Sequence, residues 1–269
     1  MDRPDWAPAG IDIDKPSAAR VYDYSLGGTH NFAADRAIIE ALNAAVPSGP
    51  LIPRSNRAFL HRAVRYLTDV GIRQFLDIGS GIPTSGNVHQ IAQQAAPGAR
   101  VVYVDIDPVA VAHSQAILAG NPHAMAIQAD ARQPDAILHH PQVCSLLDFD
   151  QPMAVMLVAI LHLIADIDDP AGIAAQFTGA VVPGSYLAIS HMTGESRPEE
   201  MKKVEELLAR TPTPLTLRTR AQIAQMFAGL DLVAPGLVWV PQWRPDAPDD
   251  NLDNHPELSG VLGGIGYKA

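Results

Sequence analysis

The sequence predicts an α/β fold in which a mostly parallel sheet carries helices on both faces. From about residue 71 onward, short apolar segments of strand length alternate with segments of helical character. The apolar segments lack polar alternation, which is typical of parallel strands that are covered on both faces. Right-handed crossovers join such strands. The 269 residues allow one large domain or two small ones, and the alternation favours one.

Seven strands and the helices between them follow from this pattern. The strands are expected at about 73–78, 100–105, 124–129, 153–161, 185–190, 237–240 and 260–267. The helices are expected at about 85–96, 108–118, 134–140, 168–181, 199–210 and 221–228.

The amino-terminal part of the chain predicts an extended arm followed by helices. Residues 1–16 are rich in proline and aspartate, which favours an extended segment. Helices are expected to begin at Ser17 and Ala33. After an interruption at 47–53, Ser55 is expected to cap a third helix with an apolar stripe.

A glycine turn follows the first predicted strand. The segment Asp77-Ile78-Gly79-Ser80-Gly81-Ile82-Pro83-Thr84 connects this strand to the next predicted helix. Glycines let the backbone turn sharply and approach a ligand closely, and the free N–H groups of a helix start favour negative groups. The dinucleotide fingerprint requires a third small residue where this chain has Thr84. The turn therefore indicates a nucleoside site that fits NAD poorly.

Acidic residues end the next two predicted strands. Asp105 follows the apolar run 101–104, and a carboxylate in this position can accept hydrogen bonds from both ribose hydroxyls. Asp130 ends the third run and can accept a hydrogen bond from an adenine amino group. Both acids strengthen the prediction of a nucleoside site.

Three motifs resemble the successive motifs of class I S-adenosylmethionine-dependent methyltransferases. They are Asp77-x-Gly79-x-Gly81, Asp105-x-Asp107-Pro108 and Ala129-Asp130-Ala131. Two amino-terminal segments, 20–36 and 54–60, are similar to one bacterial S-adenosyl methyltransferase family of unassigned substrate. The likeness covers nearly the whole chain. Pro83 stands where many members of the wider class have a third glycine, but Gly-Ser-Gly-x-Pro-Thr is similar to the narrower family.

The resemblance implies a Rossmann-like class I methyltransferase fold. Its sheet is seven-stranded and mostly parallel with helices on both faces, its last two strands are antiparallel, and extra helices precede it. The expected division is an arm and helical cap over the cofactor site at 1–70 and a Rossmann-like core at 71–269, in one structural domain overall.

The resemblance also implies S-adenosylmethionine as cofactor and S-adenosylhomocysteine as product. In similar enzymes the residue matching Asp77 holds the methionine ammonium, the one matching Asp105 binds the ribose, and Ile106 would pack on the adenine. The implied cofactor-binding residues are Tyr24, Asn31, Arg57, Asp77, Gly79, Ser80, Gly81, Pro83, Thr84, Asp105, Ile106, Asp107, Asp130, Ala131, Ala159 and His162.

Basic residues follow one face of the third predicted helix. Arg54, Arg57, His61 and Arg65 are spaced by three and four residues. They could form a solvated face or pair with surplus acids. Alternatively, Arg54 or Arg57 binds the carboxylate of the cofactor's methionine part.

The sequence assigns no catalytic residue. The end of the fourth strand lacks the Asn/Asp-Pro-Pro-aromatic motif of many nucleobase and glutamine amino-group methyltransferases. His162 is a candidate general base and His191 a second one, although either could simply pack in the core. A base is needed only if the acceptor must lose a proton.

Composition limits the partners. The formal net charge of −10, from 19 basic and 29 acidic residues, argues against binding of nucleic acid through its phosphates. The single Cys144 fits a reducing compartment, and the longest apolar stretch, 153–165, is too short to span a bilayer. We expect a cytoplasmic monomer or homodimer without metal or membrane contacts.

The predicted function is therefore methyl transfer to an unidentified, small-molecule acceptor. The alternative from another class is a non-catalytic protein that binds S-adenosylmethionine as a sensor or partner. An NAD-dependent oxidoreductase is a third reading, which Pro83 and Thr84 disfavour.

Overall fold

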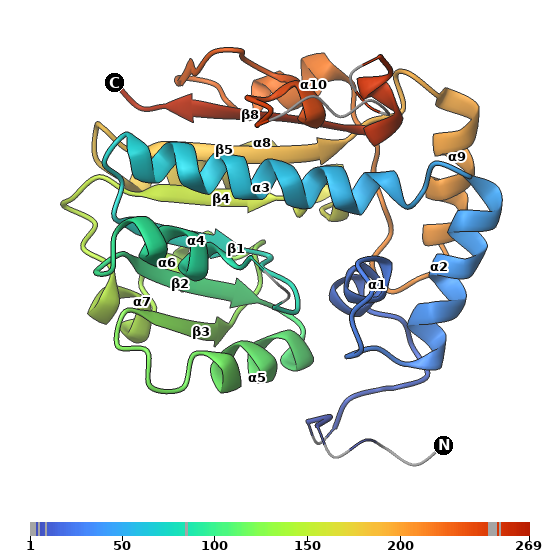
Figure 1. Cartoon of the computed structure of the whole chain (residues 1–269), viewed down its shortest axis with the longest axis horizontal. Helices are drawn as coiled ribbons and strands as arrows, with labels where there is room; N and C mark the ends of the chain where they lie inside the picture. Colours follow the sequence, from blue (N-terminus) through green and yellow to red (C-terminus); the bar gives the residue numbers. More distant parts are fainter. Residues whose placement is uncertain (1–3, 5, 9, 84–85, 247–251, 253) are drawn as a thin grey trace.

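The parallel strands form one sheet, and their carboxyl ends meet at one edge beneath a helical cap (Figure 1). This computed structural model describes residues 4, 6–8, 10–83, 86–246, 252 and 254–269. Within these residues the sheet contains eight strands in the order β3-β2-β1-β4-β5-β8-β6, and β7 also pairs with β8. The strands are β1 (Gln74–Ile78), β2 (Arg100–Asp105), β3 (Ala124–Gln128), β4 (Ala154–Val158), β5 (Tyr186–Met192), β6 (Asp231–Leu232), β7 (Val238–Trp239) and β8 (Val261–Tyr267).

The sheet confirms the mostly parallel α/β prediction. Strands β1 to β5 are mutually parallel, whereas β8 runs antiparallel to β5 and receives β6 and β7 on its other edge. The expected sixth strand at 237–240 is the short β7. The prediction missed β6, because two exposed residues are too few to show a strand pattern.

The helices occur close to where the sequence predicts them. They are α1 (Ala18–Ser25), α2 (Ala33–Ala45), α3 (Leu51–Asp69), α4 (Val88–Ala95), α5 (Pro108–Ile117), α6 (Pro134–Leu138), α7 (Pro141–Leu146), α8 (Pro170–Ala180), α9 (Pro198–Leu208) and α10 (Arg220–Gln225). The expected start of α3 at Ser55 is wrong. Pro53 lies in its first turn, where a missing N–H removes no helical bond, so Ser55 is a buried interior residue. The prediction also missed α7.

Alternate residues of the strands pack on opposite faces of the sheet. On one face Phe75 packs with Phe59 and Val64 of α3, and on the other face Leu76 packs with Phe177 of α8. All five residues of β1 are buried. Two apolar layers therefore enclose the strand, which explains why its sequence lacks polar alternation.

Helices α1, α2 and α9 stand beyond the carboxyl ends of the parallel strands (Figure 1). Helix α2 packs against α9, and Val46 and Val204 belong to a small apolar cluster between these elements. Helix α3, in contrast, packs across the sheet with Phe59 and Ala63 completely buried. The cap that we expected at 1–70 therefore consists of α1 and α2, and α3 packs as a core helix.

No described helix is long and apolar enough to cross a membrane. The described residues also contain no group of three or more His, Cys, Asp or Glu side chains that could hold a metal ion.

Candidate cofactor and acceptor site

A cavity of about 1030 Å³ lies at the carboxyl ends of β1, β2 and β4, between the sheet and the cap. This volume is at the upper end of the range for pockets that hold one ligand of drug size. The predicted residues that line the cavity are Tyr24, Arg57, Asp77, Gly79, Ser80, Gly81, Asp105, Ile106, Asp107, Asp130, Ala131, Ala159 and His162. Asn31 and Pro83 are not among the lining residues, and Thr84 lies outside the described part of the chain.

The glycine turn depends on the backbone freedom of two residues. Gly79 and Gly81 have φ values of +71° and +68°, which side chains rarely allow. A Cβ on Gly79 would lie 2.6 Å from the Ile160 side chain, whereas a Cβ on Gly81 would enter open space. The N–H groups of Gly79 and Ser80 donate to the Val104 carbonyl at 2.8 and 3.1 Å, so the turn is fixed to β2.

Asp77 is a carboxylate that is buried at the end of β1. Its side chain lines the cavity at the end of β1, and no described residue donates a hydrogen bond to it. Burial raises the pKa of Asp77 to about 7, the charge of Asp105 raises it further, and Arg57 opposes the rise. An unpaired buried charge is unfavourable. A ligand cation beside Asp77 would remove this cost.

Arg57 supplies the opposite charge near the same end of the cavity. Its guanidinium lies over the Tyr22 ring, 5.9 Å from the centroid, and its enclosed Nε has no hydrogen-bond partner among the described residues. Arg54 also lines the cavity, but its side chain is exposed. Arg57 can bind an anion and Asp77 a cation. These are the two charges of an amino acid. The chain therefore fits the methionine part of S-adenosylmethionine.

Asp105 is held rigidly at the end of β2. Its carboxylate accepts hydrogen bonds from Gly81 N at 2.7 Å and from Asp107 N at 2.8 Å. Burial raises the pKa of Asp105 to about 6, although these two bonds oppose the rise. A carboxylate has about four acceptor positions, so both oxygens can still accept from ligand hydroxyls. Ile106, which is 56% exposed, provides an apolar wall beside it.

Asp130 is engaged by a neighbouring arginine. The Arg132 guanidinium donates to both carboxylate oxygens at 2.6 to 3.0 Å and holds the pKa of Asp130 below its usual value. Both residues line the cavity. The carboxylate therefore stays charged, with fewer positions left for a ligand than the sequence suggested.

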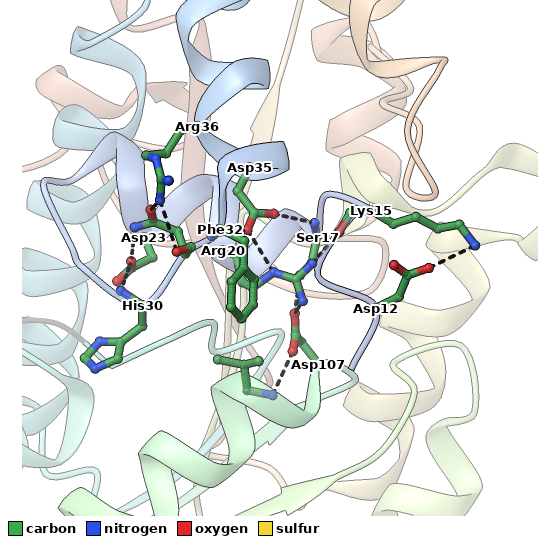
Figure 2. Close-up of polar contacts among 12 residues, drawn as sticks. Asp12, Lys15, Ser17, Arg20, Asp23, His30, Phe32, Asp35, Arg36 and Asp107 are labelled. Atoms are coloured by element: carbon green, nitrogen blue, oxygen red, sulfur yellow. Dashed lines mark hydrogen bonds and ion pairs between the residues drawn. The ribbon is translucent and has the colours of Figure 1, made fainter. Parts of the chain in front are cut away.

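Arg20 joins the cap to the edge of the sheet (Figure 2). This arginine of α1 is only 4% exposed. Its Nε donates to Asp35 of α2 at 3.0 Å, and its Nη1 lies 3.6 Å from Asp107, the residue that caps α5. We call these three residues the Arg20 clasp.

The clasp occupies the oxygens of Asp107. One oxygen accepts from Val109 N at 2.8 Å, and the other accepts from the Ser17 hydroxyl and faces Arg20. The sequence predicted Asp107 as a cofactor ligand. In the structure this carboxylate binds the cap and the start of α5, and Asp107 also lines the cavity, two residues from Asp105.

Asn31 closes the loop between α1 and α2. Its Nδ2 donates to Asp23 at 2.9 Å, and its Oδ1 accepts from Arg36 at 3.1 Å. Asp23 also accepts from His30 N at 2.9 Å (Figure 2). The contacts of Asn31 are therefore within the cap. The sequence predicted a direct contact with the cofactor.

The two candidate histidines lie side by side, but only His162 lines the cavity. His191 is completely buried, its Nδ1 bonds to the Met192 carbonyl at 2.7 Å, and its Nε2 accepts from Arg218 at 2.9 Å. Burial lowers the pKa of His191 to about 4. Both nitrogens of His191 are therefore engaged, and neither is free to contact a ligand.

Arg218 lies beside His191 and contacts the segment that follows β4, and the sequence analysis did not predict this. It is 4% exposed, and its guanidinium binds Asp166 at 2.7 Å and the Leu161 and Ile164 carbonyls at 2.9 and 2.8 Å. It therefore fixes the backbone just after β4. No motif marks this residue in the sequence.

A directional hydrogen-bond chain links the end of β4 to the cap. Ala159 has an unusual φ of +58°, and its backbone N–H donates to the Ser190 hydroxyl at 2.9 Å. This hydroxyl in turn donates to Oδ1 of Asn56 at 2.5 Å. Asn56 donates to the Tyr22 hydroxyl at 2.9 Å, which donates to the Pro53 carbonyl at 3.2 Å. Asn56 and Ser190 were not predicted, although Asn56 lies in the segment 54–60 that carried the family resemblance.

A family model described as S-adenosyl methyltransferase matches residues 4–269. The chain belongs to this S-adenosyl methyltransferase family. Two solved structures of 40% identity agree. One is a DUF574 family protein from Streptomyces avermitilis MA-4680 (TM-score 0.91, 96% of this chain and 100% of the other), and one is a candidate methyltransferase from Thermobifida fusca YX (TM-score 0.92, 98% and 99%).

More distant structures share the class I methyltransferase fold. The N-methyltransferase NodS from Bradyrhizobium japonicum WM9, solved with S-adenosyl-L-homocysteine, is 11% identical with a TM-score of 0.50, over 87% of this chain and 97% of its own. The comparison with proteins of curated function finds no match.

Replacing Arg20 should destabilise this S-adenosyl methyltransferase family member strongly. Arg20→Met leaves Asp35 and Asp107 as buried, uncompensated carboxylates, so we expect a loss of about 3 kcal/mol or more in the free energy of unfolding. Urea denaturation measures this loss. Combining Arg20→Met with Asp35→Asn should restore part of it, and a loss below about 1 kcal/mol for the single variant would refute the clasp.

Asp77→Asn should change how stability depends on pH. Burial raises the folded-state pKa of Asp77 from 3.8 to about 7, so the folded protein binds the proton more tightly than the unfolded chain. The wild type therefore loses stability as the pH rises toward and through 7, and the asparagine variant escapes this loss. Thermal unfolding without ligand should show a Tm advantage of Asp77→Asn that is larger at pH 8 than at pH 5. An equal difference at both pH values would contradict this assignment.

Proposed function

We propose that the protein transfers the methyl group of S-adenosylmethionine to a small-molecule acceptor. The main support is that Asp77, a buried carboxylate to which no described residue donates a hydrogen bond, lies near the Arg57 guanidinium at the end of the cavity formed by the glycine turn. This arrangement matches the zwitterionic end of the cofactor.

The proposed placement assigns each part of the cofactor to residues that line the cavity. Asp77 binds the methionine ammonium, Arg57 its carboxylate, and Asp105 the ribose hydroxyls. Ile106 packs on the adenine. Asp130 and Ala131 border the same region. The turn residues Gly79, Ser80 and Gly81 allow the backbone to approach the ligand, and Ala159 lies on the opposite wall beside His162.

Catalysis in this proposal consists of placement and exclusion of water. The bound cofactor supplies a methyl group on a sulfonium, which is a good leaving group. The protein holds the acceptor in line with that methyl group, and the cap keeps water out. The hydrogen-bond chain from Ala159 to Tyr22 positions the wall of the cavity beside the acceptor.

A small acceptor agrees with the net charge of −10, which disfavours nucleic acid. We further propose a cytoplasmic location, since one cysteine fits a reducing compartment. No observation favours the non-catalytic sensor.

Asp105→Ala should weaken binding of S-adenosylmethionine and S-adenosylhomocysteine by about 10- to 100-fold, since hydrogen bonds to a charged group are lost. Calorimetric titration of both ligands, with NAD as the negative control ligand, measures this. Asp231→Ala on the exposed strand β6 is the matched control and should bind normally. Unchanged affinity in Asp105→Ala, or tight binding of NAD, would refute the proposed site.

A further inference from the structure

The cavity continues beyond the cofactor end into an apolar chamber. Its walls come from α2, α9 and the segment 211–215, and include Leu42, Val204 and Leu215. Of the described residues in these three elements, none that lines the cavity carries an ionisable side chain. Leu42 remains only partly buried although it faces a small apolar cluster. The chamber therefore suits an apolar molecule.

His162 provides a polar group that lines the same cavity from the 3-10 turn Leu161–Leu163, which follows β4. Its Nδ1 accepts a hydrogen bond from Met192 N at 3.3 Å. A backbone N–H can only donate, so Nδ1 carries no proton. The neutral ring therefore carries its proton on Nε2, which has no partner among the described residues.

Neighbouring groups keep His162 neutral. The ring lies 5.4 Å from the His191 ring, and burial together with the nearby His191 and Arg218 lowers the pKa of His162 well below its usual value. His162 is therefore a hydrogen-bond donor toward the cavity. To serve as a base it would have to lose the Met192 hydrogen bond.

Asp12, Lys15 and Asp168 also line the cavity, but they are exposed to solvent; among the cavity-lining residues of α2, α9 and the segment 211–215, none can act as a base. The Tyr22 hydroxyl donates to Pro53, burial raises its pKa, and Asn56 is an amide. Asp77 and Asp105 belong to the cofactor end. An alcohol, which must lose a proton, is therefore a poor acceptor. An amine that accepts the hydrogen bond from Nε2–H uses its only lone pair and cannot attack the methyl group with it. A carboxylate can accept this hydrogen bond with one oxygen and attack with the other.

We propose that the acceptor is an apolar carboxylic acid that is converted to its methyl ester. This rests on the proposed function. One carboxylate oxygen accepts the hydrogen bond from Nε2 of His162, and the other attacks the methyl carbon. The new bond is carbon–oxygen, the carbon–sulfur bond breaks, and its electron pair remains on sulfur as S-adenosylhomocysteine. The negative charge of the acid and the positive charge of the sulfonium are both consumed, and no proton moves.

The binding test uses protein saturated with S-adenosylhomocysteine. Calorimetric titration with decanoate and with 3-phenylpropanoate should show saturable binding, and 1-decanol and decylamine should bind at least 10-fold more weakly. Leu208→Asp, which places a charge in the chamber, should abolish binding of both acids. Lys203→Asp on the exposed face of α9 should not. Equal or tighter binding of the alcohol or amine, or no binding of either acid, would overturn the proposal.

Two substitutions of His162 test whether its side chain acts as a hydrogen-bond donor or as a general base. Glutamine places an N–H near the position of Nε2, and phenylalanine removes it. For decanoate with S-adenosylmethionine, we expect His162→Gln to retain at least a tenth of kcat/KM and His162→Phe to lose about 100-fold. Equal loss in both variants would exclude the donor role.

S-Adenosylhomocysteine affinity distinguishes the two proposals. If the wild type fails to bind S-adenosylhomocysteine, the proposed function fails. If it binds the cofactor product but favours the alcohol or amine as acceptor, only the assignment of an acid fails.

Discussion

The Arg20 guanidinium is the contact on which the architecture of the site depends. It is buried between Asp35 of the cap and Asp107 at the start of α5, and it also donates to the Lys15 carbonyl. A buried ion group of this kind is a weak source of net stability but is costly to disrupt. Its geometric effect is to hold α1 and α2 over the edge where the parallel strands end.

The clasp and the proposed cofactor site share one loop. Asp107 binds the cap, and Asp105, two residues earlier, accepts N–H bonds from both the glycine turn and Asp107 itself. A ligand that contacts Asp105 therefore acts on the loop that carries the clasp. We expect the order of the cap and the occupancy of the cofactor site to be coupled through this loop.

The residues at the proposed cofactor end of the cavity could be predicted from the sequence better than those at its opposite end. A glycine turn and strand-end acids are local patterns, and the sheet brings them together because parallel strands end at one edge. The dual use of Asp107, by contrast, depends on Arg20, which lies 87 positions earlier in the sequence. The tautomer of His162 depends on a backbone N–H of another strand. Contacts between distant segments leave no spacing pattern in the sequence, so these contacts could not be predicted. The contacts of Arg218 could not be predicted for the same reason.

Because the clasp and Asp105 share one loop, we expect the cap to close on a bound cofactor. Amide hydrogen exchange with and without saturating S-adenosylhomocysteine tests it most directly, because exchange reports local opening residue by residue. We predict increased protection in the turn at 79–81 and in α1 and α2 together, and little change in β6 and β7. Protection confined to the turn, with the cap exchanging as fast as in the free protein, would contradict the claim.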